Sequence, residues 1–466
     1  MHTLCNVTRR TVWVAALLLM FIAASAHAQT QRTWSSGATS GSWATSGNWS
    51  GGTAPSSGNS INFTNNAQTT MTNDLNATNR YNGLYMRSNA TSDRTLVGNF
   101  NMFGEFSGSA SKIEISSGTQ RTLTISGNVS VGGNTNLAYE INPVGGSIVI
   151  GGSITDFGSG RVLNIWGNNT ENDLVRSVTV SNGVTGGNGL LRVRQYANLI
   201  LMGTSTYTNN TEIDTGTLML GQGGNDGALS TNTAIYVGNG AVNGNATLRF
   251  GKTNGGQTLA AGAILQINAN GSGGIRTIRS DNTSGTNTIE RTINNNAQLF
   301  ITNAAGGTLK FTGAFTNTAN SLVIQGGVTN AVVAFAASNS FSNVFLDHGH
   351  ARFETADSWG LGRLALGQNA AATNAAAVSF TTNLTVGAAF EARTNAGRKI
   401  IQYSGGAGTL TLSGPITNNA SGTSSGLELD VAAGGTMHAS GALTGDGTPV
   451  FTKTGSGVFI ASGAAG

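Results

Sequence analysis

Short runs of alternating apolar and polar residues recur along nearly the whole chain after its first 30 residues. Val, Ile or Leu takes every second position in these runs, and Gly, Asn, Ser or Thr fills the gaps between them. Clear examples are 122–126, 147–150, 177–180, 199–202, 217–220, 234–237, 308–311 and 409–412. This alternation predicts β-strands with one buried face, and the gaps predict turns. The pattern predicts an all-β protein of short strands, compatible with a sandwich, a barrel or a solenoid.

A longer repeat favours the solenoid. Residues 207–221 (YTNNTEIDTGTLMLG) have a degenerate copy in 341–353 (FSNVFLDHGHARF), and 453–463 (KTGSGVFIASG) begin a third. The first two share an aromatic residue, a polar stretch, an aliphatic residue and then Asp-x-Gly, at Asp214 and Asp347. One short strand has too little apolar surface to bury alone, whereas stacked repeats build a continuous interior.

These motifs resemble the autotransporter-associated β-strand repeat family. The resemblance is clearest in 199–221 and 453–463, and the Gly-rich segment that holds Trp34, Trp43 and Trp49 is similar to the start of such proteins. The resemblance implies a right-handed parallel β-helix with a passenger-like or surface-exposed role. We therefore predict an all-β, right-handed parallel β-helix that follows a signal peptide.

The first 28 residues have the organisation of a secretory signal. Arg9-Arg10 precede an apolar stretch at 12–22, and Ala26-His27-Ala28 forms a small-x-small cleavage site. This order predicts an exported chain that begins at Gln29 and lies outside the cell or on its outer surface. The alternative is a membrane anchor, but a spanning helix needs about 20 apolar residues. No later stretch is apolar enough to span a membrane.

The mature chain is expected to have two parts. Residues 29–63 form a Trp/Gly-rich N-terminal cap region, and 64–466 form the β-helical repeat region. A solenoid needs its last turn covered, because an open edge of strands invites aggregation. Since a repeat opens at Lys453 and the sequence stops at Gly466, we expect a fragment of a longer reading frame. The missing part would hold more repeats and then a membrane barrel or a sorting anchor.

Charge and cysteine content narrow the range of functions. Only 9% of residues are charged, against about 25% in typical proteins, while 38% are hydrophobic and 68 are Gly. The hydrophobic share is too high for a disordered chain. No run of Lys or Arg offers a phosphate-binding patch, so nucleic acid is not expected as a partner. The only cysteine, Cys5, lies in the signal, which leaves the mature chain without disulfides or thiolate ligands.

One candidate metal site is the pair His348 and His350, which a straight strand would place on one face. Asp347 and Glu354 lie close enough in sequence to be recruited as further ligands. In the alignment of the two repeats, however, both histidines replace threonines, which favours a variable surface turn. We therefore predict neither a metal nor another cofactor.

Charged pairs are the candidates for sugar chemistry. Glu212 with Asp214, and Glu428 with Asp430, each flank one aliphatic residue, so both acids of a pair would point outward into water. Such pairs could bind calcium or serve a glycosidase. Arginine pairs could clamp the substrate of a polysaccharide lyase. The remaining candidates are Glu171 and Asp173 in an Asn-rich turn, Arg192 with Arg194, Arg276 with Arg279, and a faint calcium-repeat match at 221–227.

The prediction is thus a non-enzymatic, adhesin-like surface scaffold without catalytic residues. Its expected partner is an extracellular polysaccharide or the surface of a host or neighbouring cell. Two alternatives stay open. One is a β-helical polysaccharide lyase or hydrolase, which calcium-dependent cleavage of anionic glycans would reveal. The other is a carbohydrate-binding module that stacks sugars on Trp34, Trp43 or Trp49.

Overall fold

The computed structural model describes residues 30–464, apart from short segments. The segments left out are 36, 39, 65–67, 103–109, 117–119, 133–137, 168–175, 239–243, 270–273, 317–319, 328–329, 338, 340, 356–361, 368–372, 394–396, 420–425 and 447–449. The signal peptide predicted for 1–28 lies outside the described residues.

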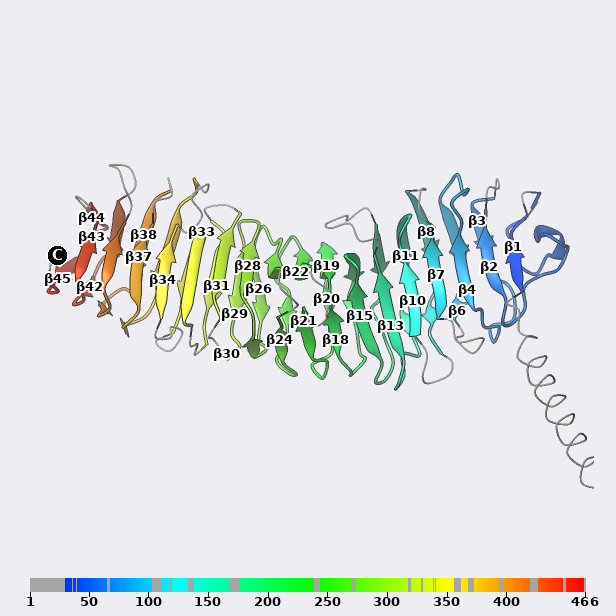
Figure 1. Cartoon of the computed structure of the whole chain (residues 1–466), viewed down its shortest axis with the longest axis horizontal. Coiled ribbons are helices and arrows are strands. Elements are labelled where there is room, and N and C mark those ends of the chain that lie inside the picture. The colour runs from blue at the N-terminus through cyan, green and yellow to red at the C-terminus, as the bar shows by residue number, and fades with distance from the viewer. Residues whose placement is uncertain are drawn as a thin grey trace, which may run out of the picture.

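The molecule is a long rod of stacked strands (Figure 1). Its described residues form 45 strands and one short 3-10 helix, η1 (Ser46–Asn48), with β1 (Gln31–Thr33) near one end and β45 (Val458–Ala461) at the other. Neighbouring strands come from successive turns of the chain and run parallel, which defines a β-solenoid of about 15 turns. The predicted all-β, parallel β-helical fold is confirmed. Among the described residues, no helix is both long and apolar enough to cross a membrane.

Three long sheets run along the rod. Sheet 1 has twelve strands: β1, β2 (Ser60–Phe63), β4 (Gly83–Met86), β7 (Ser111–Ile115), β10 (Ala138–Asn142), β13 (Val162–Trp166), β15 (Leu190–Arg194), β18 (Thr211–Ile213), β21 (Ile235–Val237), β24 (Leu265–Ile267), β27 (Ile293–Asn295) and β30 (Phe315–Thr316). Sheet 2 is formed by β3 (Thr70–Thr72), β5 (Arg94–Val97), β8 (Arg121–Ile125), β11 (Gly146–Ile150), β14 (Ser177–Val180), β16 (Ala197–Leu201), β19 (Gly216–Gly223), β22 (Ala246–Lys252), β25 (Arg276–Ser280), β28 (Leu299–Asn303), β31 (Leu322–Gly326), β33 (Asn343–Phe353), β34 (Arg363–Leu366), β37 (Ala389–Ala392), β40 (Ile416–Asn418) and β43 (Leu443–Gly445).

Sheet 3 covers the C-terminal half, and β33 bends so that it belongs to both sheets 2 and 3. The members of sheet 3 are β23 (Thr258–Leu259), β26 (Thr286–Ile289), β29 (Thr308–Phe311), β32 (Val332–Phe335), β33, β35 (Ala376–Phe380), β38 (Lys399–Tyr403), β41 (Leu427–Val431) and β44 (Phe451–Thr454). Three smaller sheets comprise β6 (Phe100–Asn101), β9 (Val129–Ser130) and β12 (Ile154–Thr155); β17 (Gly203–Thr204) and β20 (Gly227–Ala228); and β36 (Leu384–Val386), β39 (Gly408–Leu412), β42 (Gly435–Ala439) and β45.

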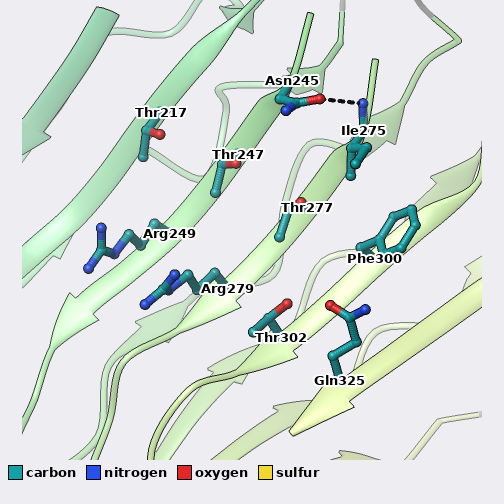
Figure 2. A pocket seen from close by; sticks show the side chains of 10 residues that line it. All are labelled: Thr217, Asn245, Thr247, Arg249, Ile275, Thr277, Arg279, Phe300, Thr302 and Gln325. Carbon is teal, nitrogen blue, oxygen red and sulfur yellow. Dashed lines mark hydrogen bonds between the residues drawn. The ribbon is translucent and has the colours of Figure 1, made fainter. Parts of the chain in front are cut away.

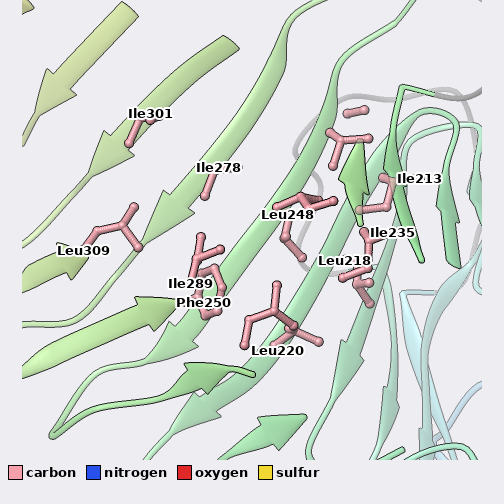
Figure 3. Packing of buried hydrophobic residues seen from close by; sticks show 14 of the residues in the cluster. Ile213, Leu218, Leu220, Ile235, Leu248, Phe250, Ile278, Ile289, Ile301 and Leu309 are labelled. Carbon is pink, nitrogen blue, oxygen red and sulfur yellow. The ribbon is translucent and has the colours of Figure 1, made fainter. Parts of the chain in front are cut away.

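The interior is a stack of apolar rows that follow the strand register. In sheet 2 one inward row continues from turn to turn through Leu218, Leu248, Ile278 and Ile301, all of them buried (Figure 3). Strand side chains alternate between faces, so each second residue joins such a row. Each buried Leu or Ile contributes about 1.5–3 kcal/mol relative to its exposed state, which explains why the apolar alternation specifies the fold.

A column of phenylalanines fills the interior beneath sheet 3. The rings of Phe311, Phe335, Phe353 and Phe380 are stacked, with successive centroids 5.5, 5.2 and 5.5 Å apart. They are register partners on β29, β32, β33 and β35, so the parallel pairing itself places one ring above the next.

The Asp-x-Gly repeat marks tight corners of the coil. Gly216 (φ 113°) lies at the corner between β18 and β19, and Gly349 (φ 95°) lies inside β33 where that strand turns from sheet 2 to sheet 3. Both glycines adopt the left-handed region that other residues disfavour. The two copies of the repeat therefore share a corner geometry, although they form different corners of the coil.

Candidate functional site

Two rows of outward side chains on sheet 2 form a groove across five neighbouring strands, β19, β22, β25, β28 and β31 (Figure 2). In the first row Thr217, Thr247, Thr277 and Phe300 are register partners, one from each strand of β19, β22, β25 and β28. The second row contains Arg249, Arg279, Thr302 and Gln325. With Asn245 and Ile275 these residues line a groove of about 400 Å³. We call it the sheet 2 groove.

An arginine pair forms the positively charged side of the groove. Arg249 and Arg279 each donate from Nε to the carboxylate of Asp281, over 2.5 and 2.8 Å. Because Nε is used, the Nη nitrogens at the tips of both guanidinium groups remain for other acceptors. Two arginine side chains thus share one carboxylate, which leaves the cluster with an excess of positive charge.

The rest of the groove mixes hydroxyl, amide and apolar surface. Three threonines of the first row line it beside the half-buried ring of Phe300, and Ile275 is 42% exposed. The side chain of Asn245 accepts a hydrogen bond from the backbone N–H of Ile275 (2.8 Å), which fixes the turn that carries this isoleucine. The groove can thus donate and accept hydrogen bonds, cover a small apolar face and hold an anion.

The sequence prediction missed this groove, although it singled out Arg279. The signal is the recurrence of Thr247-Leu-Arg249 as Thr277-Ile-Arg279, thirty residues later. In register, two such Thr-x-Arg strands place threonine beside threonine and arginine beside arginine. The predicted partner Arg276 is instead buried in the interior, because residues three apart in a strand face opposite sides.

The histidine pair does not share one face, although a straight strand would place both residues there. His348 is in register with Gln325 in sheet 2, whereas His350 pairs with Val332 in sheet 3, because the left-handed Gly349 turns the chain between them. In the described part of the chain, no three His, Cys, Asp or Glu side chains gather as metal ligands.

His350 is a half-buried, hydrogen-bonded side chain. Its Nε2 lies 2.7 Å from the hydroxyl of Ser379, which is 1% exposed and therefore out of reach of a substrate. The same kind of contact recurs between His438 and Ser462, also at 2.7 Å. A histidine–serine contact that recurs between turns indicates a structural pairing. Burial, assisted by the charge of Arg352, lowers the pKa of His350 to about 4.

This burial predicts that acid weakens the fold through His350. Between pH 6.5 and about 4 the unfolded chain binds a proton at this histidine that the folded chain does not bind. The free energy of unfolding therefore decreases as the pH falls through this window, and the full contribution of His350 is present only above pH 6.5. The loss amounts to about 3 kcal/mol. We expect His350→Asn to lose less thermal stability than the wild type between pH 7 and pH 4. His438→Asn, whose serine contact is exposed, should remain as acid-sensitive as the wild type. Equal sensitivity of all three proteins would contradict this prediction.

The predicted carboxylate pairs point away from the interior. The pair Glu212 and Asp214, however, is covered by arginine side chains and is not exposed to water. Arg192 lies 2.5 Å from Glu212, and Arg194 lies 3.0 Å from Asp214, so that both acids are buried beneath the arginines. Burial raises the pKa of Asp214, and Arg194 opposes that shift. These four residues neutralise one another across neighbouring strands of sheet 1.

The other acidic candidates are also engaged with neighbours. Glu428 contacts Arg398 and accepts a hydrogen bond from Thr454, while Asp430 accepts one from Gln402 (2.7 Å). In the segment 221–227, two backbone hydrogen bonds join Gln222 and Asn225, and Lys252 lies 2.7 Å from Asp226. Glu171 and Asp173 lie outside the described residues.

The three N-terminal tryptophans are packed together and buried. Trp49 contacts Trp34 and Trp43 edge-to-face, with centroids 4.8 and 5.5 Å apart, and its Nε1 donates to the backbone oxygen of Trp43 (2.8 Å). Trp43 also packs against Tyr81 (5.6 Å). Since all three rings are within 2% of full burial, none offers a face to a sugar. Their packing extends the aromatic interior to the first turns of the rod.

Fold and groove together define a parallel β-solenoid with a cationic groove on one face. The chain matches no protein-family model, no curated protein and no solved structure.

Proposed function

We propose that the protein is an exported, non-enzymatic β-helical scaffold of the cell surface, with a passenger-like or adhesin-like role. The observation that carries this proposal is the stack of parallel strands along the rod (Figure 1). Such a rod is longer than a compact domain of the same mass, and it presents long rows of outward side chains. Both features suit contact with an extracellular polysaccharide or a neighbouring cell. The signal-like residues 1–28 and the resemblance to autotransporter-associated β-strand repeats support the same role.

Location is tested in cells that produce the protein from its own gene. We expect the N-terminus of the mature protein to be Gln29, antibodies against residues 30–464 to label intact cells, and external protease to remove that label. A cytoplasmic marker that survives the protease controls for lysis. A full-length product that retains residues 1–28 inside the cell would refute export.

The non-enzymatic part of the proposal is tested separately. Purified protein is incubated with polygalacturonate and with alginate, with and without calcium, next to an active lyase as positive control. We expect neither new reducing ends nor unsaturated products. Calcium-dependent depolymerisation would overturn this part of the proposal and favour a lyase.

A further inference from the structure

The sheet 2 groove concentrates positive charge on a protein that has few charges. Arg249 and Arg279 come from successive strands, β22 and β25, and Asp281 holds both by Nε, with 18% and 41% of their side chains exposed. Planar guanidinium groups bind carboxylate or sulfate through paired hydrogen bonds, which are stronger than those between neutral groups. Two of them side by side favour a ligand with acidic groups.

The shape of the groove favours a linear ligand. Its rows follow the stacking direction, because the members of each row are register partners on successive strands. At about 4.8 Å per strand, the row from Thr217 to Phe300 is about 14 Å long. The groove lies on the outer face of sheet 2, so a linear chain that follows its two rows would run along the rod.

The polar and apolar groups of the groove suit sugar rings. The hydroxyls of Thr217, Thr247 and Thr277 can each donate and accept hydrogen bonds, as sugar hydroxyls require. Ile275 and Phe300 offer apolar surface for the C–H face of a ring. A nucleic acid is less well served, because single strands bind through several stacked aromatic rings and a longer track of cations.

We propose that the sheet 2 groove binds an acidic polysaccharide, whose carboxylate or sulfate groups contact Arg249 and Arg279 and whose rings lie along the threonine row. The inference rests on the proposed function in one respect: the protein must be exported to encounter such a polysaccharide. The chemistry of the groove stands independently of where the protein resides.

A second arginine cluster on the same sheet provides a matched control. Glu391 contacts Arg363 and Arg393, the latter over 3.2 Å, so two arginines again share one carboxylate. None of these three residues lines the sheet 2 groove. Arg363→Gln with Arg393→Gln therefore removes the same charge from the same sheet without altering the groove.

Binding is measured by calorimetry on the full chain at physiological ionic strength. The probes are polygalacturonate for carboxylate, chondroitin sulfate for carboxylate with sulfate, neutral dextran, and single-stranded oligothymidine for phosphate. We expect the wild type to bind at least one acidic polysaccharide and to ignore dextran. Arg249→Gln with Arg279→Gln should weaken this binding about tenfold or more, because charge-assisted hydrogen bonds are lost. The control double variant should bind within about twofold of the wild type.

Each outcome decides the proposal. Loss of binding only in the groove variant supports it, and the preferred polymer distinguishes carboxylate from sulfate. Equal loss in both double variants, equal binding of dextran, tighter binding of oligothymidine, or no binding of either acidic polymer by the wild type would overturn it. If the double variant does not fold, Arg279→Gln alone replaces it, since that side chain is the more exposed of the two. A negative binding result does not change the outcome of the location test in intact cells, so the two proposals can be refuted independently.

Discussion

Phe335→Ala is expected to destabilise the middle of the rod by about 3–5 kcal/mol. The ring of Phe335 stacks between Phe311 and Phe353, at 5.5 and 5.2 Å, and meets Phe315 and Phe341 at 5.9 and 5.4 Å. Removing it leaves a cavity bounded by four rings that the rigid strand stack cannot close. The cost therefore combines lost apolar burial with the cavity itself.

The effect should be local as well as large. Each turn of a solenoid contacts only its neighbours, so hydrogen exchange should accelerate on β29, β32 and β33 before it does elsewhere. Thermal unfolding followed by circular dichroism gives the overall loss. Phe300→Ala serves as control, because this ring is half-buried on the outer face and should cost about 1 kcal/mol or less. Equal losses for the two variants would show that the phenylalanine column does not stabilise the rod as described.

Strand positions could be predicted because the local pattern is sufficient for them. The alternation at 308–311 corresponds to β29, that at 409–412 lies within β39, and that at 122–126 overlaps β8. In each of these strands the aliphatic residues point inward and the polar ones outward. Burial of one face depends only on period two, which can be read from a few adjacent residues.

The groove could not be predicted in the same way, because it depends on register. Arg279 is thirty residues from its partner Arg249 but 23 from Thr302, its partner on the other side. The turns between strands vary in length, so no fixed period gives the neighbours of a residue. For the same reason the sequence did not show that Arg192 and Arg194 pair with Glu212 and Asp214.

The interior of the solenoid also holds a charged side chain that the sequence analysis did not single out. Arg291 is fully buried and donates to the backbone oxygens of Ser230 (2.7 Å), Thr233 and Ala260 (3.2 Å). Burial lowers its pKa to about 10. A single guanidinium thus ties several turns together, and nothing in the local pattern around residue 291 indicates it.

Gly216→Ala is expected to cost about 2–5 kcal/mol, through two separate effects. The backbone of Gly216 has φ 113°, which strains any residue with a side chain. A Cβ atom at this position would also lie 2.3 Å from the backbone oxygen of Ala197 on the neighbouring strand β16. Backbone held in a parallel ladder cannot move away without breaking its own hydrogen bonds, so the clash displaces the whole corner.

Gly223→Ala separates these two effects within the same strand, β19. Gly223 also has a positive φ, 61°, but its Cβ would meet nothing within 4 Å, so strain alone should cost about 1 kcal/mol. Thermal unfolding of both variants gives the difference, and limited proteolysis shows whether the coil opens first around residues 197–246. A much larger loss for Gly216→Ala means that close stacking of successive turns requires glycine at the Asp-x-Gly corner. Equal small losses would mean that the corner needs only the left-handed backbone, and the repeat would then specify a turn without specifying how tightly the turns stack.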